Sequence, residues 1–128
     1  MNPTESKYFL DSSAWLSYFF AENEEIKGII DDNNMLFTSV ISLFEIKRKL
    51  MRDKLDLNKI SSILSYIKEK SIIARIEQDI CEKAAEISIK EKLHAIDSII
   101  YTASLVNNCI FVTGDKDFKN IGNAILIK

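Results

Sequence analysis

Apolar positions along the chain fall into short continuous runs and into longer segments that repeat every three to four residues. Short runs are typical of buried strands, and the longer repeat is typical of helices. Strands are predicted at residues 8–10, 35–38, 71–76, 109–112 and 124–127. Helices are predicted at residues 14–21, 24–32, 40–54, 57–69, 79–90 and 96–107. Strands that alternate with helices pair in parallel, so the pattern predicts an α/β fold, a three-layer α/β/α sandwich with a central, mostly parallel sheet.

The helix predicted at 40–54 rests on apolar residues that recur at three- and four-residue steps. These residues are Val40, Leu43, Phe44, Leu50 and Met51. Before the first helix, Ser12 and Ser13 are candidate N-caps, because a serine hydroxyl accepts a hydrogen bond from an unpaired helical N–H.

The length of 128 residues predicts a single domain over 1–128 that begins with a short polar segment at 1–6. No export signal or membrane-length apolar run is present, so a cytoplasmic protein without a membrane partner is expected. Cys81 and Cys109 are accordingly interpreted as reduced core thiols. The net charge of −2 provides no bulk attraction to nucleic acid, although a local basic stripe still could.

Four acids occupy positions at which an α/β sheet can form a binding site. Asp11 directly follows the first predicted strand, and Asp115 follows the strand at 109–112. Glu45 and Asp97 lie in the opening turns of two helices. Ligands in such folds bind at the carboxyl ends of the strands. Four carboxylates gathered there would repel one another unless a cation joined them, and Mg²⁺ or Mn²⁺ prefers such oxygen ligands.

Each acid alone also has a structural explanation. Asp11 could cap the following helix, and Asp97 could be favoured by the dipole at a helix start. Glu45 could pair with a cation one turn further along its helix, and Asp115 could be a turn residue after a glycine. The combination therefore supports a site more strongly than any one member does. The single histidine, His94, is expected to lie in a loop or to cap a helix.

The residues around the acids resemble the four motifs of PIN domains, in the order of that family. The motifs are YFLDSS at 8–13, TSVISLFE at 38–45, IDSIIYTA at 96–103 and FVTGDKDF at 111–118. The resemblance extends over residues 7–127 and implies a metal-dependent endoribonuclease that uses Mg²⁺ or Mn²⁺ and leaves a 5′-phosphate. It assigns catalysis and metal binding to Asp11, Glu45, Asp97 and Asp115, with Asp117 as a possible fifth ligand.

The same resemblance implies roles for residues next to the acids. Ser13 and Thr113 would be supporting hydroxyls that orient a carboxylate. Lys116 and Arg48 are candidate substrate contacts, because cations near the site could neutralise RNA phosphates. A solvated helix face is the alternative for most of the basic run at 47–54.

The resemblance also implies partners, because VapC-like members of the family are toxins of toxin–antitoxin pairs. An antitoxin and a second copy of the chain are expected beside the RNA substrate. Aromatic residues on the first helix would form either core or contact surface. These are Trp15, Tyr18, Phe19 and Phe20, of which Trp15 is bulkier than the aliphatic residue expected there.

Other classes fit less well. A receiver domain needs a second acid beside the first, and a haloacid-dehalogenase-type phosphatase needs an acid where Ser13 stands. No glycine-rich phosphate loop is present. A PIN-fold module that acts through protein or RNA contact without useful catalysis is the main alternative, and a DNA-directed nuclease of the same fold also stays open.

Overall fold

The computed structural model describes residues 6–128, so the predicted polar segment at 1–6 lies outside the described residues except for its last position. The helices are α1 (Ser12–Phe20), α2 (Glu24–Asp31), α3 (Val40–Arg52), α4 (Leu57–Lys70), α5 (Gln78–Glu91), α6 (Ala95–Val106) and the short 3₁₀ helix η1 (Lys116–Phe118). The strands are β1 (Lys7–Leu10), β2 (Met35–Ser39), β3 (Ile72–Ala74), β4 (Ile110–Thr113) and β5 (Ala124–Leu126). Within these residues, no helix is both long and apolar enough to span a membrane.

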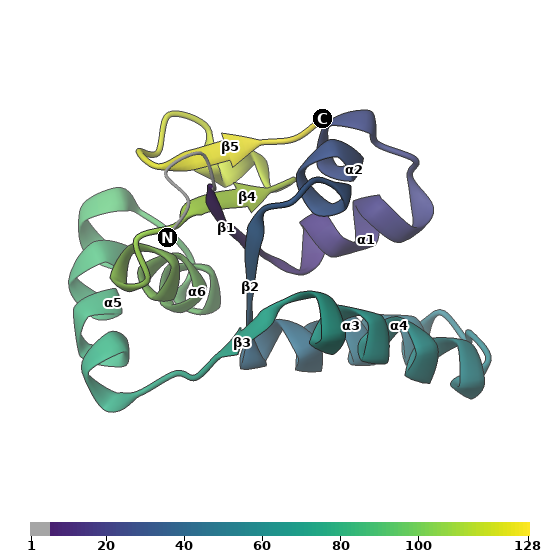
Figure 1. Ribbon diagram of the computed structural model, residues 1–128. Coiled ribbons are helices and arrows are strands. Elements are labelled where there is room, and N and C mark those ends of the chain that lie inside the picture. The colour runs from purple at the N-terminus through teal and green to yellow at the C-terminus, as the bar shows by residue number, and fades with distance from the viewer. Residues whose placement is uncertain (1–5) are drawn as a thin grey trace.

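The five strands form one sheet in the order β3-β2-β1-β4-β5, and all four neighbouring pairs are parallel. The predicted three-layer α/β fold is therefore confirmed, with a sheet that is parallel throughout (Figure 1). The chain builds the sheet outward from β1 through β2 to β3, and then returns to the other side of β1 with β4 and β5. This reversal places the topological switch point between β1 and β4, where open α/β sheets bind their ligands.

Alternate residues of the central strands face opposite helical layers, as the period of two requires. Leu10 and Val112 pair across β1 and β4 and pack into the core under α1, α2, α3 and α4. Phe9 lies between Phe37 and Phe111 on the other face, where α5 and α6 cover the sheet (Figure 1). The two layers hold the carboxyl edge of β1 and β4 in a fixed position.

Trp15 fills the core between α1 and the sheet without displacing the helix. Its side chain is fully buried, and its indole Nε1 donates a hydrogen bond of 3.0 Å to the Thr38 hydroxyl. The Thr38 hydroxyl lies 2.8 Å from the Ser71 hydroxyl, which donates to the Ile67 carbonyl. This chain of polar groups connects α1, β2 and the end of α4, so the unexpected tryptophan has its polar atom satisfied.

The apolar residues that predict α3 do not all face the core. Val40, Phe44 and Met51 are exposed, whereas Ile46 and Leu50 enter the core shared with α4. The apolar repeat of this helix contains two stripes on adjacent faces, and the periodicity fits both. Burial selects the stripe that meets the sheet and α4, which leaves the other stripe in solvent.

The two cysteines differ in environment. Cys109 is buried as predicted, and burial raises the pKa of its thiol to about 11, which keeps it protonated. Cys81 lies exposed on α5, so its interpretation as a core thiol is wrong. Its neighbours Ile80 and Ala84 occupy the buried positions of that helix instead.

Candidate metal centre

The candidate site lies at the carboxyl edge of the sheet, across the switch point between β1 and β4. Asp11 follows the last residue of β1, and Asp115 follows β4 after a single glycine. Glu45 lies on α3, which begins directly after β2, and Asp97 is the third residue of α6. Each of the four acids thus lies beside the element that the sequence pattern predicts for it.

Asp11 is the most enclosed of the acids, with 8% of its surface exposed. Its Oδ1 accepts hydrogen bonds from the Ala14 backbone N–H at 2.9 Å and from the Ser13 hydroxyl at 2.6 Å. Its Oδ2 accepts from the Thr113 hydroxyl at 2.5 Å. Asp11 is therefore the N-cap of α1 (the predicted caps Ser12 and Ser13 are instead the first residues of the helix).

Ser13 and Thr113 each join Asp11 to the loop that follows β4. The Ser13 hydroxyl donates to Asp11 and accepts from the Gly114 backbone N–H at 2.8 Å. The Thr113 hydroxyl donates to Asp11 and accepts from the Asp115 N–H at 3.0 Å. Because both hydroxyl protons point at Asp11, these contacts favour its charged form, although burial outweighs them and raises the pKa of Asp11.

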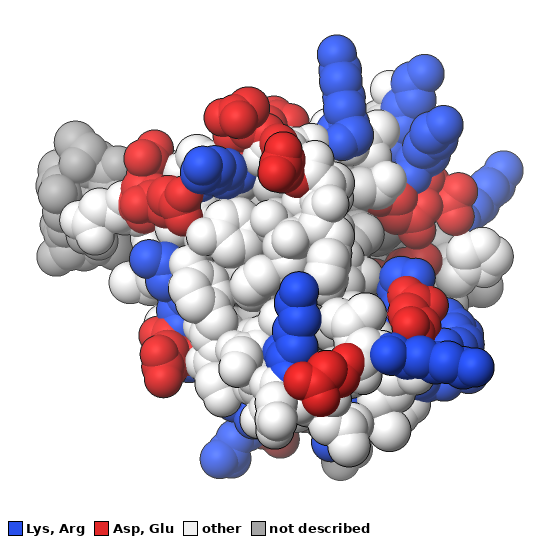
Figure 2. Space-filling model, turned by 90° about the vertical axis from the view of Figure 1, so that its right-hand side faces the viewer, with Lys and Arg blue, Asp and Glu red and all other residues white. Residues whose placement is uncertain are grey.

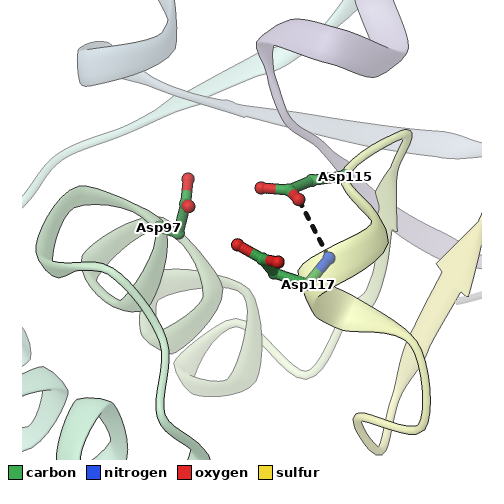
Figure 3. Close-up of side chains that lie close together, drawn as sticks. All are labelled: Asp97, Asp115 and Asp117. Atoms are coloured by element: carbon green, nitrogen blue, oxygen red, sulfur yellow. Dashed lines mark hydrogen bonds between the residues drawn. The ribbon is translucent and has the colours of Figure 1, made fainter.

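Three carboxylates converge in front of this edge: those of Asp97, Asp115 and Asp117 each offer one oxygen within 4.8 Å of the other two (Figure 3). Asp115 and Asp117 are held relative to each other, because the Asp117 N–H donates to Asp115 Oδ1 at 2.9 Å. Asp97 approaches them from α6. The acid that the sequence suggests only as a possible fifth ligand thus belongs to the tightest group, and Asp11 and Glu45 lie outside it.

Glu45 interacts with the site through its charge and through a hydrogen bond from Ser12. The Ser12 hydroxyl donates to Glu45 Oε1 at 3.3 Å, which ties α3 to the start of α1. Burial raises the pKa of Glu45, the Ser12 hydrogen bond lowers it, and the charge of Asp11 raises it further. Glu45 therefore shares the field of the other acids without sharing their closest contacts.

Asp97 experiences the charges of three other acids. Burial is the largest cause of its raised pKa, the charges of Asp115, Asp11 and Glu45 raise it further, and together these causes bring the pKa to about 6. Within residues 6–128, no lysine or arginine forms an ion pair with any of the five acids.

In the described chain, His94 is the one basic side chain that lies within ion-pair distance of these acids. Its Nε2 lies 3.6 Å from Asp117 Oδ2 in an exposed pair. The residue stands at the N-cap position of α6, without a side-chain capping bond. Its predicted place at a helix start is therefore confirmed, while its contact with Asp117 has no signal in the sequence.

The donor set fits a hard divalent cation. Every close donor is a carboxylate oxygen, which Mg²⁺ and Mn²⁺ prefer, and Mg²⁺ binds few protein ligands because it retains waters. Uncompensated carboxylates at this separation raise one another's pKa, and a cation removes that cost. The residues present therefore fit an ion of this class.

The two cations predicted as substrate contacts each lie near acids of the site. Lys116 is exposed in η1, between Asp115 and Asp117. Arg48 lines a hollow of about 480 Å³ together with Ser12 and Glu45. A view from the right-hand side of Figure 1 shows positive and negative side chains mixed around an uncharged area (Figure 2). The face shown in Figure 2 therefore offers no continuous positive surface to a polyanion.

Comparison with known proteins identifies the family. Residues 8–124 match the family model of the PIN domain, and the chain therefore belongs to the PIN-domain family. No curated protein matches the chain.

Solved structures with the same fold include partners of toxin–antitoxin complexes. A toxin–antitoxin complex from Klebsiella pneumoniae is 18% identical, with 92% of this chain and 95% of that chain covered and a TM-score of 0.74. VapBC2 from Rickettsia felis, bound to a DNA fragment from its promoter, is 19% identical, with coverage of 94% and 96% and a TM-score of 0.73. VapC20 from Mycobacterium tuberculosis, a toxin that cleaves the sarcin–ricin loop, is 16% identical, with coverage of 90% and 95% and a TM-score of 0.70. At identities this low, these structures support the fold alone.

Proposed function

We propose that this PIN-domain protein is a metal-dependent endoribonuclease that hydrolyses RNA phosphodiester bonds, and that it is the toxin of a toxin–antitoxin pair. One observation carries the enzymatic part: three carboxylates converge within 4.8 Å at the switch point of the sheet, without a lysine or arginine paired to them in the described chain. Clustered carboxylates destabilise a fold, so stability does not explain this arrangement. A site that holds a cation requires such clustered carboxylates.

In this proposal Asp97, Asp115 and Asp117 hold Mg²⁺ or Mn²⁺, with Asp11 and Glu45 completing the negative field. The ion supplies neutralisation of the phosphate charge and activation of water. Hydrolysis forms a bond from the water oxygen to phosphorus and breaks the bond from phosphorus to the 3′ oxygen, which leaves a 5′-phosphate and a 3′-hydroxyl. Ser13 and Thr113 fix the direction of the Asp11 carboxylate, so their role is positioning.

The test uses Asp97→Asn, because Asp97 makes no side-chain hydrogen bond among those described, whereas Asp11 caps α1 and Asp115 caps η1. A mixed RNA pool is incubated with wild type and variant in Mg²⁺, Mn²⁺ and EDTA. Cleavage is expected with metal, at least a hundredfold slower in the variant, and absent in EDTA. Glu86→Gln, an exposed acid on α5, is the matched control and should cleave as wild type does.

Four outcomes would contradict the proposal. Cleavage in EDTA would exclude a metal requirement. Equal cleavage by Asp97→Asn would exclude a role of the acid site in cleavage. Cleavage of a single-stranded DNA pool but not of RNA would assign the site to DNA. A folded protein that cleaves neither would favour the binding module.

The toxin role is supported by the fold shared with the toxin–antitoxin structures. Induced expression of wild type in a bacterial host is expected to arrest growth, whereas equal expression of Asp97→Asn is not. An antitoxin partner predicts relief of the arrest by co-expression of the product of the neighbouring gene. A homodimer predicts a sedimentation mass of twice 14.7 kDa for the isolated chain.

A further inference from the structure

Residues 127 and 128 follow β5 and connect the loop after β4 with α2, beside which the chain ends in Figure 1. Because all strands are parallel, Ile127 lies at the same edge of the sheet as the acid site. Its backbone N–H donates to the Thr113 carbonyl at 2.8 Å. The Lys128 carbonyl accepts from Asn23 Nδ2 at 2.7 Å. We call residues 127 and 128, with these two hydrogen bonds, the β5 strap.

The side chain of Ile127 packs against the loop that carries Asp115. It is 3% exposed and belongs to the core under α1, α2, α3 and α4. A β-carbon at Gly114 would lie 3.8 Å from Ile127 Cγ1 and 3.4 Å from Ser13 Oγ, so Gly114 lies against both side chains. The Gly114 N–H donates to the same Ser13 hydroxyl. Ile127 therefore supports the loop at the point where its backbone is bonded to α1.

Asn23 makes a contact that helix capping does not explain. As the N-cap of α2, its Oδ1 accepts the Ile26 N–H at 3.0 Å. Capping requires only an acceptor, which serine, threonine or aspartate would also provide. The amide nitrogen of Asn23 is not needed for the cap, and it donates to the Lys128 carbonyl. The asparagine thus caps α2 and joins it to the β5 strap.

The strand that precedes the β5 strap is weak by itself. β5 has three residues, lies at the edge of the sheet and is only partly buried. Short segments with exposed hydrogen bonds open more readily than the core of a protein. Movement of β5 would reach the acid site through Thr113, whose hydroxyl donates to Asp11 and accepts from the Asp115 N–H. Contacts beyond the end of β5 oppose that movement.

We infer that the β5 strap positions the acid site, with Ile127 and Asn23 as positioning residues that hold Thr113 and Gly114 in place. The inference rests on the proposed metal-dependent function and adds two residues that lie outside the four motifs. Neither side chain acts on the cation itself. Loosening the β5 strap should lower metal affinity more than an equal loss of stability elsewhere in the core.

The first test compares Ile127→Ala with Ile63→Ala. Ile63 is buried in the same core but lies on α4, which carries none of the five acids. Mn²⁺ binding to the isolated protein is measured at about pH 7.5 from the electron paramagnetic resonance signal of free Mn²⁺. Ile127→Ala is expected to weaken binding about tenfold, the lower end of the range for groups that orient metal ligands. Ile63→Ala should change it by less than about twofold, because distant sites act independently.

Urea unfolding in EDTA shows whether the two variants are matched in stability. Both remove the same side chain from the same core, so each midpoint should fall by about 1–2 M. Ile127→Val keeps a carbon at the position that faces Gly114 and should retain most of the Mn²⁺ affinity. Equal losses of affinity in Ile127→Ala and Ile63→Ala would show that Ile127 is a core residue without a positioning role.

Asn23→Asp tests the β5 strap without changing the core. The variant keeps an acceptor for the Ile26 N–H, and a carboxylate is favoured at a helix N-terminus, so the protein should fold. It loses the donor to the Lys128 carbonyl. Mn²⁺ binding is expected to weaken about threefold, since a lost hydrogen bond is transmitted only in part.

Asn34→Asp is the matched control for charge and for a lost donor. Asn34 Nδ2 donates to the Ile29 carbonyl at 3.0 Å, and the residue precedes β2 at the edge of the sheet opposite to the acid site. This variant adds the same charge as Asn23→Asp and should leave Mn²⁺ affinity unchanged.

Amide hydrogen exchange in EDTA gives a readout that needs no metal. The N–H groups of Gly114 and Asp115 donate to the Ser13 and Thr113 hydroxyls. Both should exchange several-fold faster in Asn23→Asp than in wild type, whereas the amides of α5 should not change. Faster exchange throughout the protein would instead make the β5 strap a general stabiliser.

Failure of the inference and failure of the proposed function can be distinguished. Normal Mn²⁺ affinity together with unchanged exchange at Gly114 and Asp115 in Asn23→Asp would overturn the inference, while wild type could still bind Mn²⁺ and cleave RNA. Wild type that binds no Mn²⁺ would contradict the proposed metal site. Selective acceleration of exchange at Gly114 and Asp115 would still uphold the β5 strap in that case.

Discussion

Replacing Asp97 with asparagine should stabilise the metal-free protein at alkaline pH. The substitution keeps the shape of the side chain and removes one charge from a group of acids that repel one another. Burial, followed by the charges of Asp115, Asp11 and Glu45, raises the pKa of Asp97 to about 6. The folded protein therefore disfavours the charged form that neutral solution imposes.

The magnitude follows from linkage between protonation and folding. At pH 8, a rise from the usual pKa of 3.8 to about 6 corresponds to at most about 3 kcal/mol, at 1.36 kcal/mol per pKa unit. Asp97 is only half-buried, so solvent screening reduces this to about 1–2 kcal/mol. Because folding raises the pKa of Asp97, its ionisation destabilises the folded protein. This destabilisation is absent below pH 3.8, where Asp97 is protonated in both the folded and the unfolded protein, and it is complete above about pH 6.

Urea unfolding in EDTA measures the effect. With a slope of about 2 kcal/mol per molar urea, the midpoint of Asp97→Asn should lie about 0.5–1 M above that of wild type at pH 8. At pH 4.5 the difference should shrink to less than half of that value, and Glu86→Gln should change neither midpoint. A variant that is neutral or destabilised at pH 8, or equally stabilised at both pH values, would refute the account of the acid cluster.

Three further predictions test other parts of the structure. Addition of Mn²⁺ at about a hundred times its dissociation constant should stabilise wild type by about 2.7 kcal/mol and Asp97→Asn by much less, in thermal unfolding at pH 7.5. Thr38→Val leaves the buried Trp15 Nε1–H without an acceptor and should cost about 2 kcal/mol in urea unfolding, whereas Thr38→Ser, which keeps the hydroxyl, should cost less than half of that. Thr113→Val removes a donor to Asp11 and the acceptor of the Asp115 N–H, and should lower kcat for RNA cleavage about 10- to 100-fold, with Thr113→Ser retaining most of the rate.

The sequence predicted the layers of the fold because periodicity is a local property. Short apolar runs and helical repeats can be recognised within a few residues, and their alternation implies parallel strands. The strand order cannot be obtained in that way. The pairing of β1 with β4 joins residues about one hundred positions apart, and it depends on which helices cover which face of the sheet.

The same limit applies at α3. A helix with two adjacent apolar stripes is ambiguous by periodicity, and the core that α3 shares with the sheet and α4 decides that Ile46 and Leu50 are buried. Of the apolar residues in that repeat, Leu50 is buried in the core, whereas Phe44 and Met51 are exposed to solvent. A local pattern can show that a residue is apolar, but not whether the core buries it.

Asp11 shows why a structural and a functional explanation of one residue need not compete. As the N-cap of α1, its Oδ1 accepts the Ala14 N–H, which fixes the carboxylate relative to the helix. The Ser13 and Thr113 hydroxyls then fix it relative to β4, across a separation of 102 residues between Asp11 and Thr113. A carboxylate held by three donors from both sides of the switch point has little freedom left to rotate, and a cation site needs that fixed orientation. The capping bond is therefore part of how the chain builds the acid site, and the acids that the sequence explained one at a time act together because the fold restricts them together.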